Sequence, residues 1–254
     1  MTKVLAVANQ KGGVGKTTTA VNLAASLILA SKEVLLIDLD PQGNATTGSG
    51  INKETVGETV YNVLIGEAEI SGSLVKSPEG GYDLLPANGH LAGGELELVD
   101  MKSRESRLRQ SLGKLSKNYD YVLIDCPPAL GLLTVNGFTA ADAVMIPMQC
   151  EYYALEGLRD LVETIKRIRS AFNSRLKIEG LLRTMYDPRN SLTRQVSDEL
   201  ENHFGDKVYR TVIPRNVRLA ESPSFGLPVV NFDTTSKGAL AYLDLAREVI
   251  GHNG

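Results

Sequence analysis

Residues 11–18 read Lys-Gly-Gly-Val-Gly-Lys-Thr-Thr and stand between a short apolar run at 4–8 and a helical pattern at 16–30. A glycine-rich turn between a strand and a helix can curl so that its backbone N–H groups point at one anion. The glycines that permit this curl are Gly12, Gly13 and Gly15. The helix that follows adds the positive end of its dipole. The stretch therefore predicts a phosphate-binding loop.

Two side chains of this loop have the chemistry expected for binding ATP together with Mg²⁺. Lys16 is expected to neutralise charge between the β- and γ-phosphates, and Thr17 is expected to offer its hydroxyl to the metal. The usual pattern G-x-x-x-x-G-K-[ST] requires glycine at position 10, where this chain has Gln10. A second lysine, Lys11, stands at the start of the loop.

The rest of the chain alternates apolar runs with helical patterns. Runs without polar alternation are typical of strands covered on both faces, and they lie at 33–37, 121–124, 143–147, 177–182 and 208–213. Helical patterns lie near 104–117, 154–172, 192–203 and 236–250. This order predicts one α/β domain over 1–254: a doubly wound, mostly parallel sheet with helices on both faces, of the P-loop NTPase type. Segment 41–100 is irregular and is expected to form loops with one or two short helices, either as a switch region or as a surface excursion.

Composition limits the partners and the location. The net charge of −3 gives no global basic footprint, so any nucleic-acid contact must be a local patch. Cys126 and Cys150 lack metal-ligand spacing and are expected to be reduced thiols in a core. No apolar run has the length of about 18 residues that a membrane span needs. We expect a cytoplasmic protein.

Three aspartates follow predicted strands. Ligands of doubly wound sheets bind beyond the carboxyl ends of the strands, so Asp38, Asp40 and Asp125 should share the site of the glycine-rich loop. Asp125 ends an apolar strand, where an unpaired carboxylate is costly and a water-bridged Mg²⁺ would offset that cost.

Several motifs together resemble one family, the ParA/MinD group of P-loop ATPases. Residues 11–18 look like its deviant Walker A loop. Residues 36–44 (Leu-Ile-Asp-Leu-Asp-Pro-Gln-Gly-Asn) resemble its switch I, and residues 119–128 (Tyr-Asp-Tyr-Val-Leu-Ile-Asp-Cys-Pro-Pro) its Walker B and switch II. Residues 149–157 (Gln-Cys-Glu-Tyr-Tyr-Ala-Leu-Glu-Gly) and 213–219 (Ile-Pro-Arg-Asn-Val-Arg-Leu) are similar to chromosomally encoded ParA (Soj) partition ATPases.

The resemblance implies roles for the residues of the site. In this family two subunits sandwich two ATP molecules, and the lysine matching Lys11 reaches the phosphates of the other subunit. Asp40 would position or activate the attacking water. Asp38 would lie in the outer shell of the magnesium, with capping of the switch loop as the alternative, and Asp125 would bind the metal through water. Nucleotide contacts would come from Lys11, Gly12, Gly13, Val14, Gly15, Lys16, Thr17 and Thr18.

Contacts to adenine and to DNA follow from the resemblance alone. The base would pack near Met185 and the segment Pro214, Arg215 and Asn216, although ordinary loop packing explains these residues equally well. Family members bind double-stranded DNA non-specifically as ATP dimers, which makes Arg189 and Arg218 candidate phosphate contacts. Segment 183–218 carries seven basic and five acidic residues, a composition that a mixed solvated face also explains.

The implied function is chromosome or plasmid partition. The expected partner is a ParB-like centromere-binding protein that stimulates hydrolysis, and the expected location is the nucleoid. No helix-turn-helix is expected before the first strand. The alternative is a MinD-like membrane-associated cell-division ATPase, but segment 246–254 is too short and polar for a membrane-binding helix. Two metabolic rivals are an iron–sulfur reductase, unfavoured because Cys126 adjoins Asp125, and a dethiobiotin-synthetase-like ligase.

Overall fold

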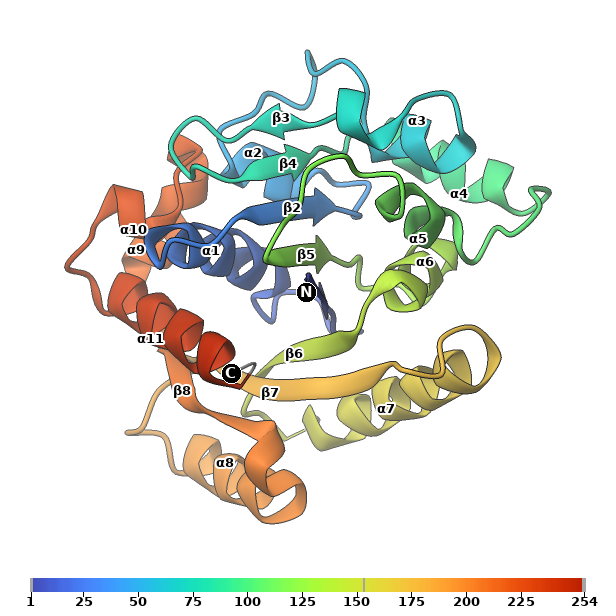
Figure 1. The fold of residues 1–254 in the computed structure, drawn as a ribbon. Coiled ribbons are helices and arrows are strands. Elements are labelled where there is room, and N and C mark those ends of the chain that lie inside the picture. The colour runs from blue at the N-terminus through green and yellow to red at the C-terminus, as the bar shows by residue number, and fades with distance from the viewer. Residues whose placement is uncertain (1, 153, 253–254) are drawn as a thin grey trace.

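The computed structural model describes residues 2–152 and 154–252, arranged around one eight-stranded sheet (Figure 1). The strand order is β3-β4-β2-β5-β1-β6-β7-β8, and every neighbouring pair is parallel except β3 with β4. The strands are β1 (Lys3–Val7), β2 (Val34–Asp38), β3 (Val75–Lys76), β4 (Asp83–Leu85), β5 (Tyr121–Asp125), β6 (Ala143–Gln149), β7 (Lys177–Tyr186) and β8 (Val208–Pro214). The predicted doubly wound, mostly parallel sheet is confirmed.

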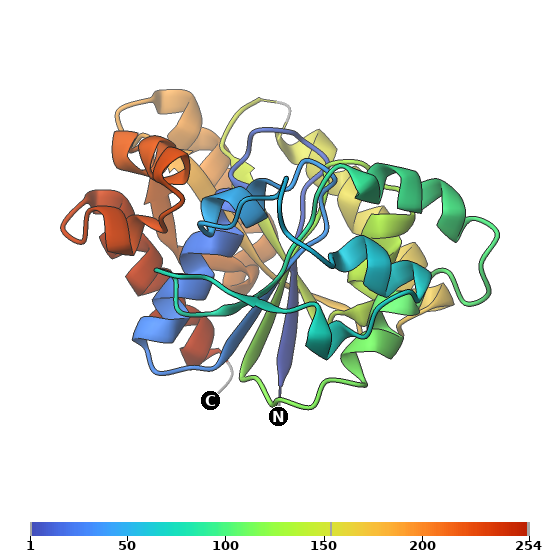
Figure 2. The ribbon, with the colours of Figure 1, turned by 90° about the horizontal axis from the view of Figure 1, so that it is seen from above.

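Helices cover both faces of the sheet (Figure 2). The longer helices are α1 (Lys16–Leu29), α4 (His90–Leu98), α6 (Leu132–Ala140), α7 (Ala154–Ala171), α8 (Ser191–Phe204) and α11 (Lys237–Gly251). Short helices are α2 (Asn44–Gly48), α3 (Val60–Ile65), α5 (Arg107–Leu112), α9 (Val217–Glu221) and α10 (Val229–Phe232), with single 3₁₀ turns η1 (Ile70–Gly72), η2 (Gly205–Lys207) and η3 (Ser222–Phe225).

The alternation of side chains along the central strands divides the core into two layers. On β1, Leu5 and Val7 pack in the layer that contains residues of α1 and α11, whereas Ala6 packs in the layer of α6 and α7. All three side chains are fully buried. A strand sends successive side chains to opposite faces, so an unbroken apolar run is what two covered faces require.

Segment 41–100 is more regular than the sequence indicated. It contains α2, α3, α4, η1 and the short strands β3 and β4, which extend the sheet at one edge. Helix α6 was not predicted, and the pattern at 104–117 forms a helix only over Arg107–Leu112. Strands of two or three residues are too short to show a periodicity, and α6 follows a glycine without an amphipathic pattern.

The chain connections open a crevice at the carboxyl ends of β1 and β5. These strands are neighbours, yet the loop after β1 leads to α1 on one face and the loop after β5 leads to α6 on the other. Val7 pairs with Asp125, and Asp38 pairs with Asp125 on the other side of β5. A crevice of this kind is where doubly wound folds bind their ligands.

Candidate nucleotide-binding site

The loop between β1 and α1 forms a cradle of backbone N–H groups. Gly13 and Gly15 have φ angles of 72° and 86°, in the left-handed region that favours glycine. Gly15 is also the N-cap of α1, whose first turn contains no acidic residue. The helix therefore presents its positive end to the crevice with no internal carboxylate beside it.

Side chains from the neighbouring strand ends hold the loop in this shape. The Thr184 hydroxyl donates to the Val14 carbonyl at 2.8 Å, and Gln149 Nε2 donates to the Gly13 carbonyl at 3.1 Å. Asn9 Nδ2 donates to the Pro147 carbonyl at 2.8 Å. Sequence reasoning gave no role to Thr184 or Asn9, and it named Gln149 only as part of the 149–157 motif. Asn9 follows β1, whereas Gln149 ends β6 and Thr184 lies near the end of β7, so these contacts become visible only once the strand order is known.

Lys16 occupies the inside of the loop. The residue is only 8 % exposed, and its Nζ donates to the Lys11 carbonyl at 3.1 Å. Burial lowers the pKa of this ammonium, while the carboxylates of Asp125 and Asp40 act in the opposite direction. An ammonium held in a nearly buried loop by a backbone carbonyl is suited to meet a phosphate.

Asp38 and Asp125 form a pair of buried carboxylates in register on β2 and β5. Asp38 Oδ2 accepts hydrogen bonds from the Thr46 backbone N–H at 2.8 Å and the Thr46 hydroxyl at 2.7 Å, and its Oδ1 accepts from the Asp40 N–H at 3.2 Å. Asp38 therefore caps the first turn of α2 and also binds the backbone of the segment that leads into it. The geometry matches the capping alternative, and metal ligation through an outer shell stays a prediction.

Asp125 is the carboxylate that the protein leaves unsatisfied. Both of its oxygens are buried and have no hydrogen-bond partner among the described residues. The Thr17 hydroxyl lies close enough to lower the pKa of Asp125, although the pair does not have the geometry of a formed hydrogen bond. Burial and the neighbouring Asp38 outweigh this and raise the pKa well above its ordinary value. A divalent cation between Thr17 and Asp125 would relieve that cost, so the donors present fit Mg²⁺.

Asp40 and Lys11 stand at the mouth of the site. Asp40 is half-buried, and its Oδ1 accepts from the Gln42 N–H at 2.9 Å. Lys11 is exposed, and its Nζ forms an ion pair of 2.5 Å with Glu151 Oε2. Both side chains of this pair are about half exposed, at 47 % and 50 %. Lys11 is therefore outside the cradle that Lys16 fills.

The ends of β7 and β8 place the proposed adenine residues beside the loop. Met185 has a φ angle of 49°, and its sulfur lies 2.7 Å from Gln149 Nε2. Tyr186 pairs with Pro214, and the Arg215 N–H donates to the Tyr186 carbonyl at 3.4 Å. Asn216 Oδ1 accepts from the Leu219 N–H at 3.3 Å and caps α9. The four residues thus lie at one edge of the site, and their contact with a base stays a prediction.

The segment after α2 and the turn that follows α9 are in close backbone contact at two glycines. Gly50 (φ 81°) ends the segment after α2, and Gly226 (φ 66°) ends η3. A Cβ atom on Gly226 would lie 2.8 Å from the Gly50 Cα, and one on Gly50 would lie 3.0 Å from the Gly226 carbonyl oxygen. Only glycine fits on either side of this backbone contact.

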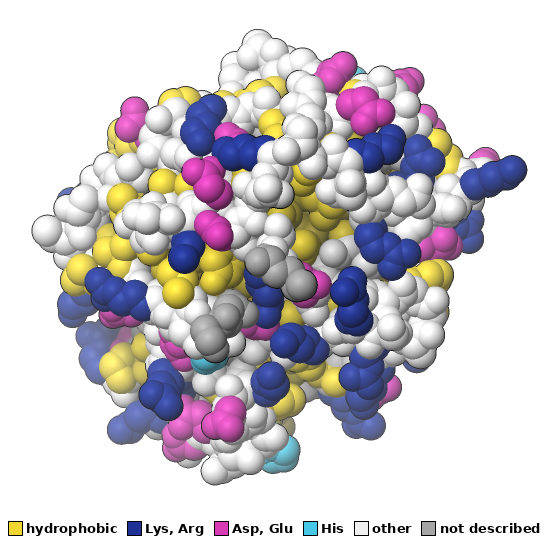
Figure 3. Space-filling model, viewed as in Figure 1, with side chains coloured by type: hydrophobic (Ala, Val, Ile, Leu, Met, Phe, Trp, Pro, Cys, Tyr) yellow, Lys and Arg dark blue, Asp and Glu magenta, His cyan; other side chains and the backbone are white. Residues whose placement is uncertain are grey.

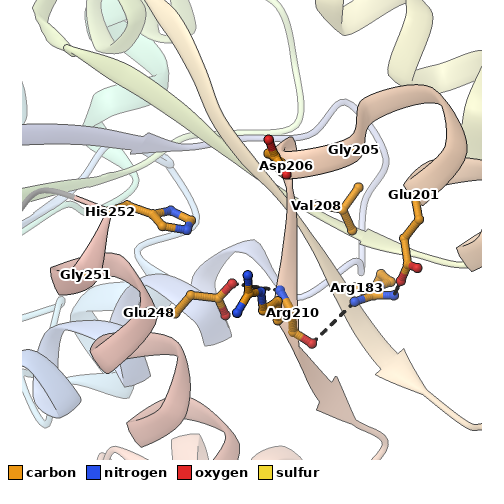
Figure 4. A pocket seen from close by; sticks show the side chains of 9 residues that line it. All are labelled: Arg183, Glu201, Gly205, Asp206, Val208, Arg210, Glu248, Gly251 and His252. Atoms are coloured by element: carbon orange, nitrogen blue, oxygen red, sulfur yellow. Dashed lines mark hydrogen bonds and ion pairs between the residues drawn. The ribbon is translucent and has the colours of Figure 1, made fainter.

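A separate hollow of about 680 Å³ lies against the edge strand β8 (Figure 4). Its charged groups hold the fold together. Arg183 donates to Ser197 Oγ at 2.7 Å and pairs with Glu201, and Glu248 accepts from the backbone N–H groups of Arg210 and Thr211. None of the predicted site residues lines this hollow.

The two arginines proposed for DNA are paired with carboxylates. Arg189 is 89 % exposed at its side chain and donates twice to Asp187, at 2.9 and 2.8 Å. These hydrogen bonds lower the pKa of Asp187 to about 2. Arg218 forms ion pairs with Glu221 at 2.9 Å and with Asp233 at 3.2 Å. Figure 3 likewise shows Lys and Arg side chains interspersed with Asp and Glu on the face that it draws.

Burial of Asp38 predicts a pH-dependent stability. Burial raises its pKa from 3.8 to about 6, against the hydrogen bonds from Thr46. The folded state then binds the proton more tightly than the unfolded state, so this term of stability falls as pH rises from about 4 to about 6 and is constant above. Asp38→Asn removes this term, and it also removes the repulsion by which Asp38 raises the pKa of Asp125, which acts in the same direction. Its free energy of unfolding relative to wild type should rise by about 2 kcal/mol between pH 4.5 and 7.5.

Urea unfolding of both proteins without nucleotide or magnesium measures this difference. Glu163→Gln is a matched control, because Glu163 is an exposed carboxylate whose pKa is lowered by its hydrogen bond with Lys166. If the difference between Asp38→Asn and wild type does not change with pH, Asp38 is not the group that titrates.

The glycine cradle, the buried Lys16 and the unsatisfied Asp125 at a doubly wound switch point define a P-loop nucleotide-binding protein. The AAA domain family matches residues 2–178. The chain is 55% identical to the chromosome partitioning protein ParA of Caulobacter vibrioides (98% of this chain, 94% of that protein) and 53% identical to the sporulation initiation inhibitor protein Soj of Bacillus subtilis (98% of each). The chain belongs to the ParA/Soj family of chromosome-partitioning ATPases.

Solved structures agree with this fold. The structure of cobyrinic acid a,c-diamide synthase from Mycobacterium smegmatis, with bound ADP and magnesium, has a TM-score of 0.87 at 41% identity, covering 99% of this chain and 95% of that chain. The septum site-determining protein MinD from Pyrococcus horikoshii is a more distant neighbour, with a TM-score of 0.82 at 25% identity over 100% and 98% of the two chains. The ParA/Soj relatives therefore support partition over the MinD-like alternative. Among the described residues, no helix combines the length and apolar character needed to span a bilayer.

Proposed function

We propose that this chain is a magnesium-dependent ATPase of DNA partition that works as an ATP-bound dimer. Two copies bind two ATP molecules between them, the dimer binds double-stranded DNA without sequence preference, and hydrolysis releases it. A ParB-like centromere-binding protein stimulates that hydrolysis, and the protein is associated with the nucleoid in the cytoplasm. The position of Lys11 is the observation that carries this proposal.

The loop contains two lysines, and they lie in different surroundings. Lys16 lies inside the cradle, whereas Lys11 is exposed at its rim and paired with Glu151. An ion pair between half-exposed groups contributes at most about 1 kcal/mol, so Lys11 can exchange it for a phosphate of a facing subunit at little cost. Phosphoryl transfer needs positive charge on the transition state, and a cation supplied in trans provides it.

The other residues have separable tasks in this proposal. The backbone N–H groups of 12–18 and the ammonium of Lys16 hold the phosphates. Thr17 and Asp125 would hold Mg²⁺, which when bound supplies charge neutralisation to the phosphates. Asp40 is half-buried within the switch segment at the mouth of the site, where it can hold a water against the terminal phosphate. Asp38 fixes the position of that segment through Thr46.

The DNA contacts require Arg189 and Arg218 to exchange carboxylates for phosphates. Both arginines are solvent-exposed, and surface pairs of this kind are weak. Each phosphate contact releases counterions, so binding should weaken with salt. Contacts to phosphates carry no base information, which agrees with non-specific binding.

The function is tested by ATP-dependent binding to random-sequence double-stranded DNA, measured with ATP and with a non-hydrolysable analogue. We expect binding with both nucleotides, and release over time only with ATP. Turnover should rise with DNA and a ParB-like protein together. If binding to DNA is the same without nucleotide, the proposed cycle is wrong.

Charge reversal at the arginines should reduce DNA binding while dimerisation persists. Arg189→Glu and Arg218→Glu should each lower the slope of log affinity against log salt by about 1 per site, or about 2 per dimer. Asp187→Asn is the informative counterpart, because it removes the carboxylate that holds Arg189 and should strengthen DNA binding. Fluorescence anisotropy across a salt series measures all three variants.

Two results would contradict this assignment. One is an unchanged slope in both arginine variants, which places the DNA face elsewhere, with Lys207 or Lys237 as the next candidates. The other is loss of ATP binding in Arg218→Glu, since Arg218 follows the proposed adenine segment closely and its effect would then act through the nucleotide.

The rival function is a synthase that acts on a small-molecule acceptor. The 41% identical protein of Mycobacterium smegmatis is named for such an activity. A synthase would require its acceptor for ATP turnover and would be indifferent to DNA. Turnover that rises with DNA and a ParB-like protein, in the absence of any acceptor, separates the two functions.

A further inference from the structure

Two consecutive carbonyls of the phosphate loop are held by side chains from the neighbouring strands. Thr184 Oγ1 donates to the Val14 carbonyl at 2.8 Å, and Gln149 Nε2 donates to the Gly13 carbonyl at 3.1 Å. In a trans peptide the carbonyl and the following N–H point in opposite directions, so these bonds also fix the N–H groups of Val14 and Gly15. Successive N–H groups of this kind are what the loop offers to a phosphate.

The two donors differ in how firmly they are placed. Thr184 is only 2 % exposed, and rotation about a single side-chain bond positions its hydroxyl oxygen. Gln149 is half-buried at the end of β6, and three rotatable bonds separate its amide from the backbone. A long side chain of this kind loses more rotamer freedom when it is fixed. The Gly13 carbonyl is therefore held only as well as Gln149 is itself held.

Met185 is the second partner of the Gln149 amide. Its sulfur lies 2.7 Å from the same Nε2 that donates to Gly13. Met185 has a φ angle of 49° inside β7, whereas the other described non-glycine residues with positive φ, Ser31 and Ser103, lie outside helices and strands. Backbone strain of this kind is concentrated at ligand sites. Met185 is thus held in an unfavourable conformation beside the loop.

The nucleoside of a bound nucleotide must lie over the strand ends on one side of the loop. On the side of β5, the strand ends carry the buried carboxylates of Asp38 and Asp125. On the side of β6 and β7, they carry the uncharged side chains of Gln149, Thr184 and Met185. A half-buried thioether makes favourable contacts with aromatic rings. The second side suits a base, and Met185 is placed to contact it.

We propose that Gln149 is a positioning residue that links the base site to the phosphate loop. The proposal rests on the ATP binding proposed above and names a residue that sets the preference for a complete nucleotide. A base that packs on Met185 restrains the thioether, the thioether restrains the Gln149 amide, and the amide holds the Gly13 carbonyl. A ligand that consists of phosphates alone leaves Met185 unrestrained and gains less from the same hydrogen bond. The coupling is reciprocal, so an ordered loop also favours the base.

The test compares ATP with inorganic tripolyphosphate, which has the phosphates but no base. Both are titrated with magnesium as competitors of a fluorescent ATP analogue, without DNA or a partner protein. Gln149→Met keeps the length of the side chain but cannot donate. It should lower the affinity for ATP by about fivefold, the scale of one hydrogen bond, and the affinity for tripolyphosphate by less than about twofold.

Thr184→Val is the matched control. It removes a hydroxyl that holds the Val14 carbonyl without an intermediary, and it keeps the shape of the side chain. It should therefore weaken ATP and tripolyphosphate by the same factor. Partial unfolding of a variant also affects both ligands and cannot mimic a loss confined to ATP.

A second variant tests the link between Met185 and Gln149. Met185→Leu keeps an apolar side chain for the base but removes the sulfur from the Gln149 amide. It should lower the affinity for ATP by about threefold and leave that for tripolyphosphate unchanged. In the Gln149→Met background it should add no further loss, because both changes break one chain of contacts.

The outcomes separate this proposal from the proposed function. Equal losses for ATP and tripolyphosphate in Gln149→Met, or unchanged ATP affinity, overturn the link, and so do additive losses in the double variant. Wild-type protein that binds ATP no more tightly than tripolyphosphate has no base contribution, which overturns the link while the phosphate site stands. Wild-type protein that does not bind ATP at all overturns the proposed function itself.

Discussion

Lys16→Ala is expected to reduce ATP binding below detection, a loss of at least about 100-fold in affinity. The substitution removes the one ammonium inside the cradle, where burial lowers its pKa and where a backbone carbonyl already directs it. In a water-poor loop the lost charge cannot be replaced by solvent. Titration with a fluorescent ATP analogue in the presence of magnesium measures the effect.

Lys11→Ala serves as the paired control for this prediction. Its proposed task lies in the other subunit, so the variant should keep substantial ATP binding but lose ATP-dependent dimerisation and turnover. Removal of its ion pair with Glu151 should change stability little, because both partners are half exposed. If Lys11→Ala still forms dimers with ATP in light scattering, the cross-subunit role is wrong. ATP binding at wild-type affinity in Lys16→Ala would contradict the role of the loop.

Asp40→Ala is expected to bind ATP and to dimerise, yet to hydrolyse at least about 100-fold more slowly, the scale of a positioned acid–base group. Asp40 is half-buried at the mouth of the site, and its hydrogen bond with the Gln42 N–H fixes the carboxylate. Its removal should leave the cradle intact, because the loop is held by Thr184 and Gln149. Single-turnover hydrolysis with DNA and the ParB-like protein measures the chemical step.

Asp125→Ala should fail at an earlier stage. Without the unsatisfied carboxylate opposite Thr17, the magnesium dependence of ATP binding should disappear along with most of the affinity gained from the metal. A binding titration with and without magnesium separates this from the loss of chemistry in Asp40→Ala. Stimulated turnover near wild type in Asp40→Ala would show that another group positions the water.

The parts of the fold that could be predicted from sequence are those whose conformation depends only on neighbouring residues in the chain. The run at 4–8, the glycines of the loop and the helical pattern after it are local, so their conformations follow from sterics and periodicity. The aspartates at strand ends followed from the general rule for doubly wound sheets. The ParA and Soj relatives confirm the family, and the solved structures confirm the fold.

Other features of the site could not be predicted because they depend on the strand order or on which side chains pair with one another. Thr184 and Gln149 lie far from the loop in sequence, and they reach it because β6 and β7 follow β1 in the sheet. The capping role of Asp38, which accepts from Thr46, could not be predicted because it depends on the path of a segment without periodicity. The pairing of Arg189 with Asp187 was invisible because a charge count does not show which groups face each other.

The contact of Gly50 with Gly226 connects the segment after α2 to the turn after η3 through the backbone alone, without charged groups. Backbone touches backbone there, so a displacement of the segment after α2 is transmitted to the turn beyond α9 by hard-core repulsion alone. Ions in solution screen the arginines that would meet DNA, but they do not screen an excluded volume. Raising the ionic strength should therefore weaken the proposed contacts between arginines and DNA phosphates without weakening the contact between these two glycines.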